Sequence, residues 1–159
     1  ERYMWSFDGE KLSEGTQPIP FRTGERVRVT LVNDTMMGHP IHLHGHDFYI
    51  LDFQANAQWS GDISRLKTDN PIRRDTATLP AGGYLVLAFE SDNPGAWLMH
   101  CHIPFHVAGG LAAQFLERAS EIQSSIGSLE PMQQGCAKWT AYHREFHPDG
   151  ILINGDSGL

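Results

Sequence analysis

The sequence is short of basic charge, of long apolar runs and of cysteine. Twelve lysines and arginines stand against nineteen acidic residues, giving a formal net charge of −7, whereas a nucleic-acid-binding surface needs a basic stripe. No apolar run approaches the roughly 20 residues that cross a bilayer. We therefore expect neither nucleic acid nor a membrane among the partners of this protein.

The chain also lacks an initiating methionine and a signal peptide, and it opens with "ERYMWSF" as a processed product or a piece of a longer protein would. Its 159 residues suit one domain, because domains commonly span roughly 100–200 residues. A hydrophobic fraction of 40% with 19% charged residues is ordinary for a globular protein.

β-Patterning dominates the first three quarters of the chain. In "RVRVTLV", Val27, Val29 and Leu31 alternate with polar residues, as in a half-buried strand. Four further stretches have strand composition and are separated by turn-forming sequences such as "LPAGG" and "SDNPG"; they are "FYILDF", "YLVLAF", "AWLMHC" and "LAAQFLE". Closely spaced strands without long helices between them predict an all-β sandwich or barrel of antiparallel strands.

The pattern changes after Glu117. "SEIQSSI" and "PMQQGCAKWTAYHREF" are typical of short helices, the second with Pro131 near its first turn. The chain closes with a Gly/Asp-rich tail. We therefore expect residues 1–118 to form the β domain and residues 119–159 to form a helical extension and tail that pack on the same domain.

Histidines crowd into the stretch "HPIHLHGHDF". On a strand, residues two apart share a face and neighbours point to opposite faces. His42 and His44 therefore point to one side. His39, three residues before His42, points to the other.

The stretch "HCHIPFH" repeats this geometry. His100 and His102 share a face, and Cys101 points away from them. If the two strands are adjacent, one side presents four imidazoles. The other presents His39 and Cys101, joined by His106 from the following loop.

The second group is the His₂Cys ligand set of a blue-copper electron-transfer site, where a weak Met often fills the axial position. Leu111, ten residues past Cys101, stands in that position and cannot ligate. A site without the axial donor favours Cu(I) and a relatively high potential. A zinc site of Cys and His ligands is the weaker alternative. Cys136 is then left without an obvious partner within the chain.

Several other residues have an ordinary structural interpretation. We expect His46, His143 and His147 to be solvated surface histidines. Met99 and the strand aromatics are expected in the core; the latter are Phe48, Tyr49, Phe89 and Trp97. "NDT" at residues 33–35 fits a glycosylation sequon, which is weak support for a secreted protein.

Three stretches carry a family resemblance: "HPIHLHGHDFYIL", the long segment from "NPIRRDTATLPAGG" to "HCHIPFHVAGGLAAQFLE", and the final "DSGL". They closely resemble the C-terminal cupredoxin domain of ascomycete laccases, within the multicopper oxidase family. The leading part, "YMWSFDGEKL" onward, is more similar to bacterial copper-resistance multicopper oxidases. The resemblance implies a cupredoxin-like Greek-key β-sandwich with short helices and a C-terminal tail.

The resemblance also implies copper as the cofactor and a role for each ligand. His39, Cys101 and His106 match the type 1 copper ligands, with Leu111 in the axial slot. His42 matches a type 2 ligand, and three histidines match type 3 ligands: His44, His100 and His102.

In the family, a phenol or diphenol gives one electron at a time to type 1 copper near an exposed histidine. This would be His106, beside Pro104 and Phe105. The electrons pass along the Cys-His path, through Cys101, His100 and His102, to a trinuclear cluster that reduces O2 to water. The "DSGL" tail matches a plug that ascomycete laccases insert toward that cluster.

A family trinuclear cluster takes eight histidines, and this chain offers four of them. The resemblance implies that N-terminal cupredoxin domains supply the others, together with a partner for Cys136. Three hypotheses stay open: a C-terminal domain of a laccase-like oxidase, a stand-alone blue-copper electron-transfer protein, and a homodimeric oxidase that joins two four-histidine faces. The resemblance implies a secreted protein, or a periplasmic one in a bacterium.

Overall fold

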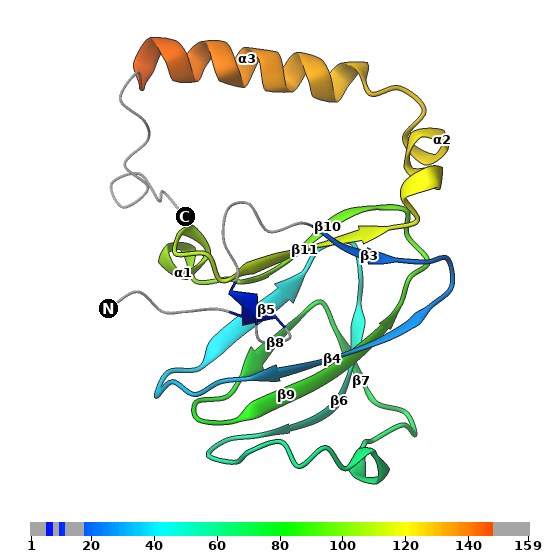
Figure 1. Ribbon diagram of the computed structural model, residues 1–159, viewed down its shortest axis with the longest axis vertical. Helices are drawn as coiled ribbons and strands as arrows, with labels where there is room; N and C mark the ends of the chain where they lie inside the picture. Colours follow the sequence, from blue (N-terminus) through cyan, green and yellow to red (C-terminus); the bar gives the residue numbers. More distant parts are fainter. Residues whose placement is uncertain (1–5, 8–9, 12–17, 148–159) are drawn as a thin grey trace.

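The computed structural model describes residues 6–7, 10–11 and 18–147. Two sheets dominate it (Figure 1). One has five strands in the order β3-β11-β10-β5-β8, and the other has four in the order β4-β9-β6-β7. A further pair, β1 (Ser6–Phe7) and β2 (Glu10–Lys11), forms a small hairpin. This arrangement confirms the predicted sandwich.

The five-stranded sheet contains β3 (Ile19–Phe21), β5 (His39–Leu43), β8 (Thr76–Leu79), β10 (Gly95–Cys101) and β11 (Ala112–Glu117). The four-stranded sheet contains β4 (Arg26–Val32), β6 (Phe48–Gln54), β7 (Ile72–Arg74) and β9 (Tyr84–Glu90). Every pairing within these two sheets is antiparallel except β3 with β11, which is parallel. All five strands predicted from composition or alternation are present.

The core lies between the two sheets. Its fully covered side chains include Leu43, Phe48 and Leu87, each 0% exposed, and burying a side chain of this kind contributes about 1.5–3 kcal/mol. Met99 is buried, as expected, and Phe48 and Phe89 are buried strand aromatics. Cys101 belongs to the same apolar cluster, so the thiol sits at the boundary between core and site.

β9 departs from simple alternation, because its first four residues are all buried. The long β6–β7 connection, which contains the 3-10 helix η1 (Ile63–Arg65), accounts for this. Trp59 of that connection packs against Tyr84 in a tilted arrangement, with ring centroids 5.2 Å apart. Both faces of β9 are therefore covered, one by the opposite sheet and one by this connection.

Four helical elements follow or interrupt the last strands: α1 (Pro104–Ala108), η2 (Ala119–Glu121), α2 (Ile122–Ile126) and α3 (Glu130–Phe146). The two predicted helical stretches are confirmed, with Pro131 in the first turn of α3. α3 has no buried residue and runs apart from both sheets in Figure 1. The boundary after residue 118 and the packing of the extension stay predictions. No described helix has the length and apolarity needed to cross a bilayer.

Candidate metal centre

Three side chains converge at one end of the core: His39 from the start of β5, Cys101 from the end of β10 and His106 from α1. His39 Nδ1 lies 3.1 Å from His106 Nδ1 and 3.7 Å from Cys101 Sγ, and His106 Nδ1 lies 3.4 Å from the same sulfur. All three residues are buried. Two nitrogens and a sulfur therefore point at one common centre.

Burial sets the protonation of this group. It lowers the pKa of His39, with a further lowering by the charge of His106, and it lowers the pKa of His106 itself. Burial raises the pKa of the Cys101 thiol, partly offset by a hydrogen bond with the backbone of Ile103. The imidazoles are thus neutral bases near pH 7, the form in which histidine ligates a metal.

The donor set fits copper better than the alternatives. Two imidazoles and one thiolate in a trigonal arrangement are the equatorial ligands of a blue-copper site, whereas structural zinc takes four ligands. Separations of 3.1 to 3.7 Å between the donor atoms leave room for one ion between them. A buried, water-poor pocket also protects a thiolate-bound metal.

Two expectations about His106 are corrected. It lies in the short helix α1, which begins with Pro104, and not in a loop. It was also expected to be exposed, but only 3% of its surface is accessible. Phe105 packs edge-on against its ring with centroids 4.6 Å apart, and Phe105 is itself 62% exposed. Solvent therefore reaches the Phe105 ring and not the His106 imidazole behind it.

Leu111 follows α1 and lies beside the centre. Its carbonyl oxygen accepts a hydrogen bond from the Cys101 N–H at 3.1 Å, and its own N–H donates to the His106 carbonyl at 2.9 Å. The Leu111 side chain packs against the core cluster that contains Cys101. Its carbon side chain offers no donor atom.

The four remaining histidines of the two motifs gather on the opposite side of the same sheet. β5 and β10 are neighbours, and His100 pairs directly with His42. Each of their ring centroids lies 4.9 to 5.6 Å from the nearest of the others. His44 and His102 are exposed, and His42 and His100 are half-buried. The predicted placement of these histidines on one face of the sheet and of Cys101 on the other is confirmed.

Two of these rings are held in the tautomer that a metal needs. His42 Nδ1 lies 2.9 Å from the Asp75 carbonyl, and His100 Nδ1 lies 2.9 Å from the Cys101 carbonyl. A carbonyl oxygen only accepts, so each Nδ1 carries a proton, and in the neutral ring the lone pair lies on Nε2. His100 Nε2 faces His44 Nε2 at 3.0 Å. Burial and the three neighbouring histidines lower the pKa of His44.

His46 is not the solvated surface residue expected from the sequence. Its side chain is only 4% exposed, and its Nε2 lies 2.8 Å from Oε2 of the fully buried Glu117. The contact is close without being ideally aligned as a hydrogen bond, and neither atom has another polar partner among the described residues. Among those residues Asp92 also has a carboxylate oxygen within 4.8 Å, but it is exposed.

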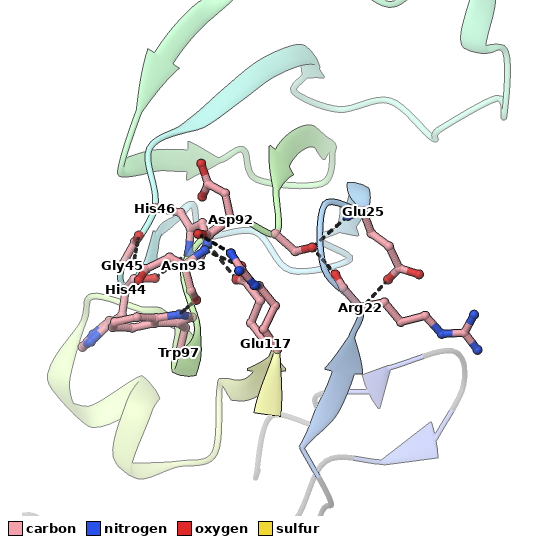
Figure 2. Close-up of polar contacts among 11 residues, drawn as sticks. Arg22, Glu25, His44, Gly45, His46, Asp92, Asn93, Trp97 and Glu117 are labelled. Atoms are coloured by element: carbon pink, nitrogen blue, oxygen red, sulfur yellow. Dashed lines mark hydrogen bonds and ion pairs between the residues drawn. The ribbon is translucent and has the colours of Figure 1, made fainter. Parts of the chain in front are cut away.

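The His46–Glu117 pair stabilises the turn that follows His44 (Figure 2). Glu117 accepts the Asn93 N–H at 2.7 Å, and the Asn93 amide donates to the Gly45 carbonyl at 2.9 Å. Gly45 has φ +73°, and a Cβ there would lie 2.5 Å from the Trp97 ring, so only glycine fits. The end of β11, the β9–β10 loop and the β5–β6 turn are thereby tied together.

Cys136 is an exposed free cysteine on α3, and the "DSGL" tail lies outside the described residues. Asn33 is 4% exposed, and its amide nitrogen donates to the carbonyls of Met37 and Pro80. The sequon nitrogen is therefore occupied inside the fold. This removes the support that the sequon gave to secretion.

Comparison with known proteins agrees with this geometry. The multicopper oxidase family model matches residues 1–121. A laccase of Arthroderma benhamiae is 42% identical over 144 residues, 86% of this chain and 22% of that protein. A laccase of Neurospora crassa is 49% identical over 133 residues, 76% of this chain and 21% of that protein. The chain thus spans about a fifth of the length of these curated relatives.

Solved structures give the same result. The crystal structure of a laccase from Botrytis aclada superposes with a TM-score of 0.72 at 36% identity, covering 92% of this chain and 28% of that one. A multicopper oxidase from Pseudomonas thermotolerans superposes with a TM-score of 0.52 at 29% identity, covering 71% of this chain and 25% of that one. Sequence, fold and the buried His-Cys-His group together show that this chain belongs to the multicopper oxidase family, as a C-terminal domain of the laccase type.

Proposed function

We propose that this chain supplies the type 1 copper site and half of the trinuclear-cluster ligands of a laccase-type oxidase. The observation that carries the proposal is the buried group of His39, Cys101 and His106 directly behind an open face of four imidazoles. Copper held by the buried group would supply one-electron redox chemistry at a site that solvent does not reach.

The ligand roles follow the two faces of the sheet. His39, Cys101 and His106 hold type 1 copper, and Leu111 occupies the axial position without ligating. His42 is a type 2 ligand, and the type 3 ligands are His44, His100 and His102. In the described residues, these four rings do not bring three donor atoms within 4.8 Å of one another, which supports a cluster completed from a second ligand set.

Cys101 links the two centres through covalent bonds. His100 and His102 are its immediate neighbours in the chain, and the His100 Nδ1–H also donates to the Cys101 carbonyl. An electron on the sulfur therefore has a short path to the imidazoles on the other face. The exposed Phe105, which covers His106, is the surface at which a phenol or diphenol donates electrons.

The partners of the chain are part of the proposal. The phenolic substrate and O2 are inferred from the laccase relatives. The other four histidines come from N-terminal cupredoxin domains, which the length of those relatives can accommodate. Secretion rests on the same relationship alone, since the Asn33 sequon is buried.

Copper stoichiometry tests the proposal. The fully loaded chain should hold about one copper ion and show an intense blue band, because only the type 1 ligand set is complete. The supporting control is restored O2 uptake with a phenol when the N-terminal domains are added. A loaded chain without a blue band contradicts the type 1 assignment.

The homodimeric oxidase predicts a different number of copper ions per chain. Two four-histidine faces joined by a two-fold axis would supply eight imidazoles, and the chain would then hold about two and a half copper ions. The open face of His44 and His102 is the feature that favours this second candidate. A homodimeric oxidase would show the molecular mass of a dimer and would take up O2 without any other chain. One copper with a monomeric mass excludes it.

A further inference from the structure

His39 makes contacts through both nitrogens of its ring. Nδ1 faces His106 and the Cys101 sulfur, as described above. Nε2 lies 3.2 Å from the hydroxyl oxygen of Thr35, in the loop between β4 and β5. Because a metal-binding imidazole must present a lone pair on one nitrogen, the group that contacts the other nitrogen decides which one is available.

The Thr35 hydroxyl has one proton, and its surroundings determine where that proton goes. Asn33 Oδ1 lies 2.7 Å from the hydroxyl oxygen, and the Met37 carbonyl lies 3.1 Å from it. Both of these oxygens only accept hydrogen bonds. The hydroxyl therefore donates toward them and presents a lone pair to His39.

The buried side chain of Asn33 makes this arrangement unambiguous. Its amide nitrogen donates to the Met37 carbonyl at 2.7 Å and to the Pro80 carbonyl at 2.8 Å. A reversed amide would place an oxygen against both carbonyls, so the amide cannot flip without losing two hydrogen bonds. Its oxygen is thus fixed toward Thr35, where it also accepts the Thr35 backbone N–H at 2.9 Å.

We propose that Thr35, oriented by Asn33, is a positioning residue that keeps the proton of His39 on Nε2 and turns Nδ1 toward the metal pocket. The proposal rests on the proposed role of His39 as a type 1 copper ligand. With Nε2 donating to Thr35, the neutral ring keeps its Nδ1 lone pair directed at the copper position. Without the hydroxyl, the ring is free to protonate Nδ1 or to rotate, and both changes oppose metal binding.

A purely structural role for Thr35 is the competing explanation, since the same residue closes the turn at residues 33–37. Two substitutions separate the explanations. Thr35→Val keeps the branched shape and removes the hydroxyl, whereas Thr35→Ser keeps the hydroxyl. Thr68→Val, at an exposed threonine on the β6–β7 connection, is the matched control. Thermal unfolding of each copper-free variant shows whether the fold is retained.

The readouts are copper affinity, measured by competition with a chelator, and the visible and EPR spectra of the blue site. Loss of a hydrogen bond to a metal-binding histidine typically weakens metal affinity about 10–100-fold. We expect that loss and an altered spectrum in Thr35→Val, with near-normal values in Thr35→Ser and Thr68→Val. Normal affinity and spectrum in Thr35→Val, or equal losses in Thr35→Val and Thr35→Ser, would overturn the proposal.

A second measurement uses the unchanged, copper-free chain and does not depend on folding of a variant. Long-range ¹H–¹⁵N NMR correlations of the histidine rings report which nitrogen is protonated. The proposal requires His39 to carry its proton on Nε2, and an Nδ1–H tautomer contradicts it. The Nε2–H tautomer in a chain that binds no copper would leave the Thr35 contact supported and the proposed function refuted, so the two failures are distinguishable.

Discussion

The imidazole of His46 and the carboxylate of Glu117 meet 2.8 Å apart where solvent does not reach. His46 Nδ1 donates to the His44 carbonyl at 3.1 Å, since that oxygen can only accept. The Glu117 carboxyl accepts from Asn93 through its other oxygen. The pair therefore joins the turn next to a proposed copper ligand to the end of β11.

Glu117→Ala should destabilise the copper-free chain by about 1–3 kcal/mol, because it leaves the buried His46 ring without its polar partner. Glu117→Gln should cost much less, because its amide can still accept from Asn93 and donate to His46. Urea unfolding of both variants measures the difference. Equal free energies of unfolding for the two variants would mean that the contact with His46 contributes little.

Cys101→Ser should abolish the blue band while leaving the fold largely intact, since serine fills the space but offers no thiolate. Cys136→Ser is the matched control, because Cys136 is exposed on α3. It should keep the wild-type spectrum. The measurement is the visible spectrum of each copper-loaded variant beside its circular dichroism. A Cys101→Ser chain that stays blue would refute the ligand assignment.

Leu111→Met should lower the type 1 reduction potential, because an axial thioether stabilises Cu(II) relative to Cu(I). Redox titration of the blue band gives the potential. Leu116→Met on β11, away from α1, should leave it unchanged. An unchanged or raised potential in Leu111→Met would count against the axial position of this residue.

Copper affinity should rise with pH by about tenfold per unit around neutrality, because each ion displaces one proton. Burial raises the pKa of the Cys101 thiol, so the thiol is protonated near pH 7, whereas His39 and His106, whose pKa values are lowered, are already neutral and release no proton when a metal binds. Falling pH therefore favours the metal-free form. Competition titrations across this range, repeated with Cys136→Ser, measure the slope, and a slope near zero is incompatible with a protonated thiol.

Strands with a clear apolar or alternating pattern were predictable from the sequence, and the two short strands β7 and β8 were not. β4 has an alternating pattern, and β10 contains a histidine-cysteine motif. By contrast, β7 and β8 lie within "IRRDTATL", where the arginines and the aspartate interrupt any alternation of apolar and polar residues. Both are short and lie at a sheet edge, whereas β4, another edge strand, is longer and keeps its alternation. The His₂Cys group was accessible to prediction because strand parity places His39 and Cys101 on the same face, and His106 follows shortly after Cys101 in the sequence.

His46 shows where sequence reasoning ended. Its partner Glu117 lies on the last strand, and nothing in the residues around His46 indicates a buried carboxylate so distant along the chain. The contact of Thr35 with His39 was missed for a related reason. It depends on the amide orientation of Asn33, which Pro80 of another loop fixes.

β10 and the residue that follows it carry proposed copper ligands on both faces, with Cys101 facing the core between His100 and His102, which face outward. A strand reverses its faces whenever one residue is added or removed. A single-residue insertion or deletion near Met99 would therefore exchange the faces of the thiol and the imidazoles and disable both proposed copper centres at once. Substitutions can alter either proposed centre separately, but the number of residues in β10 has to stay the same for both centres to form.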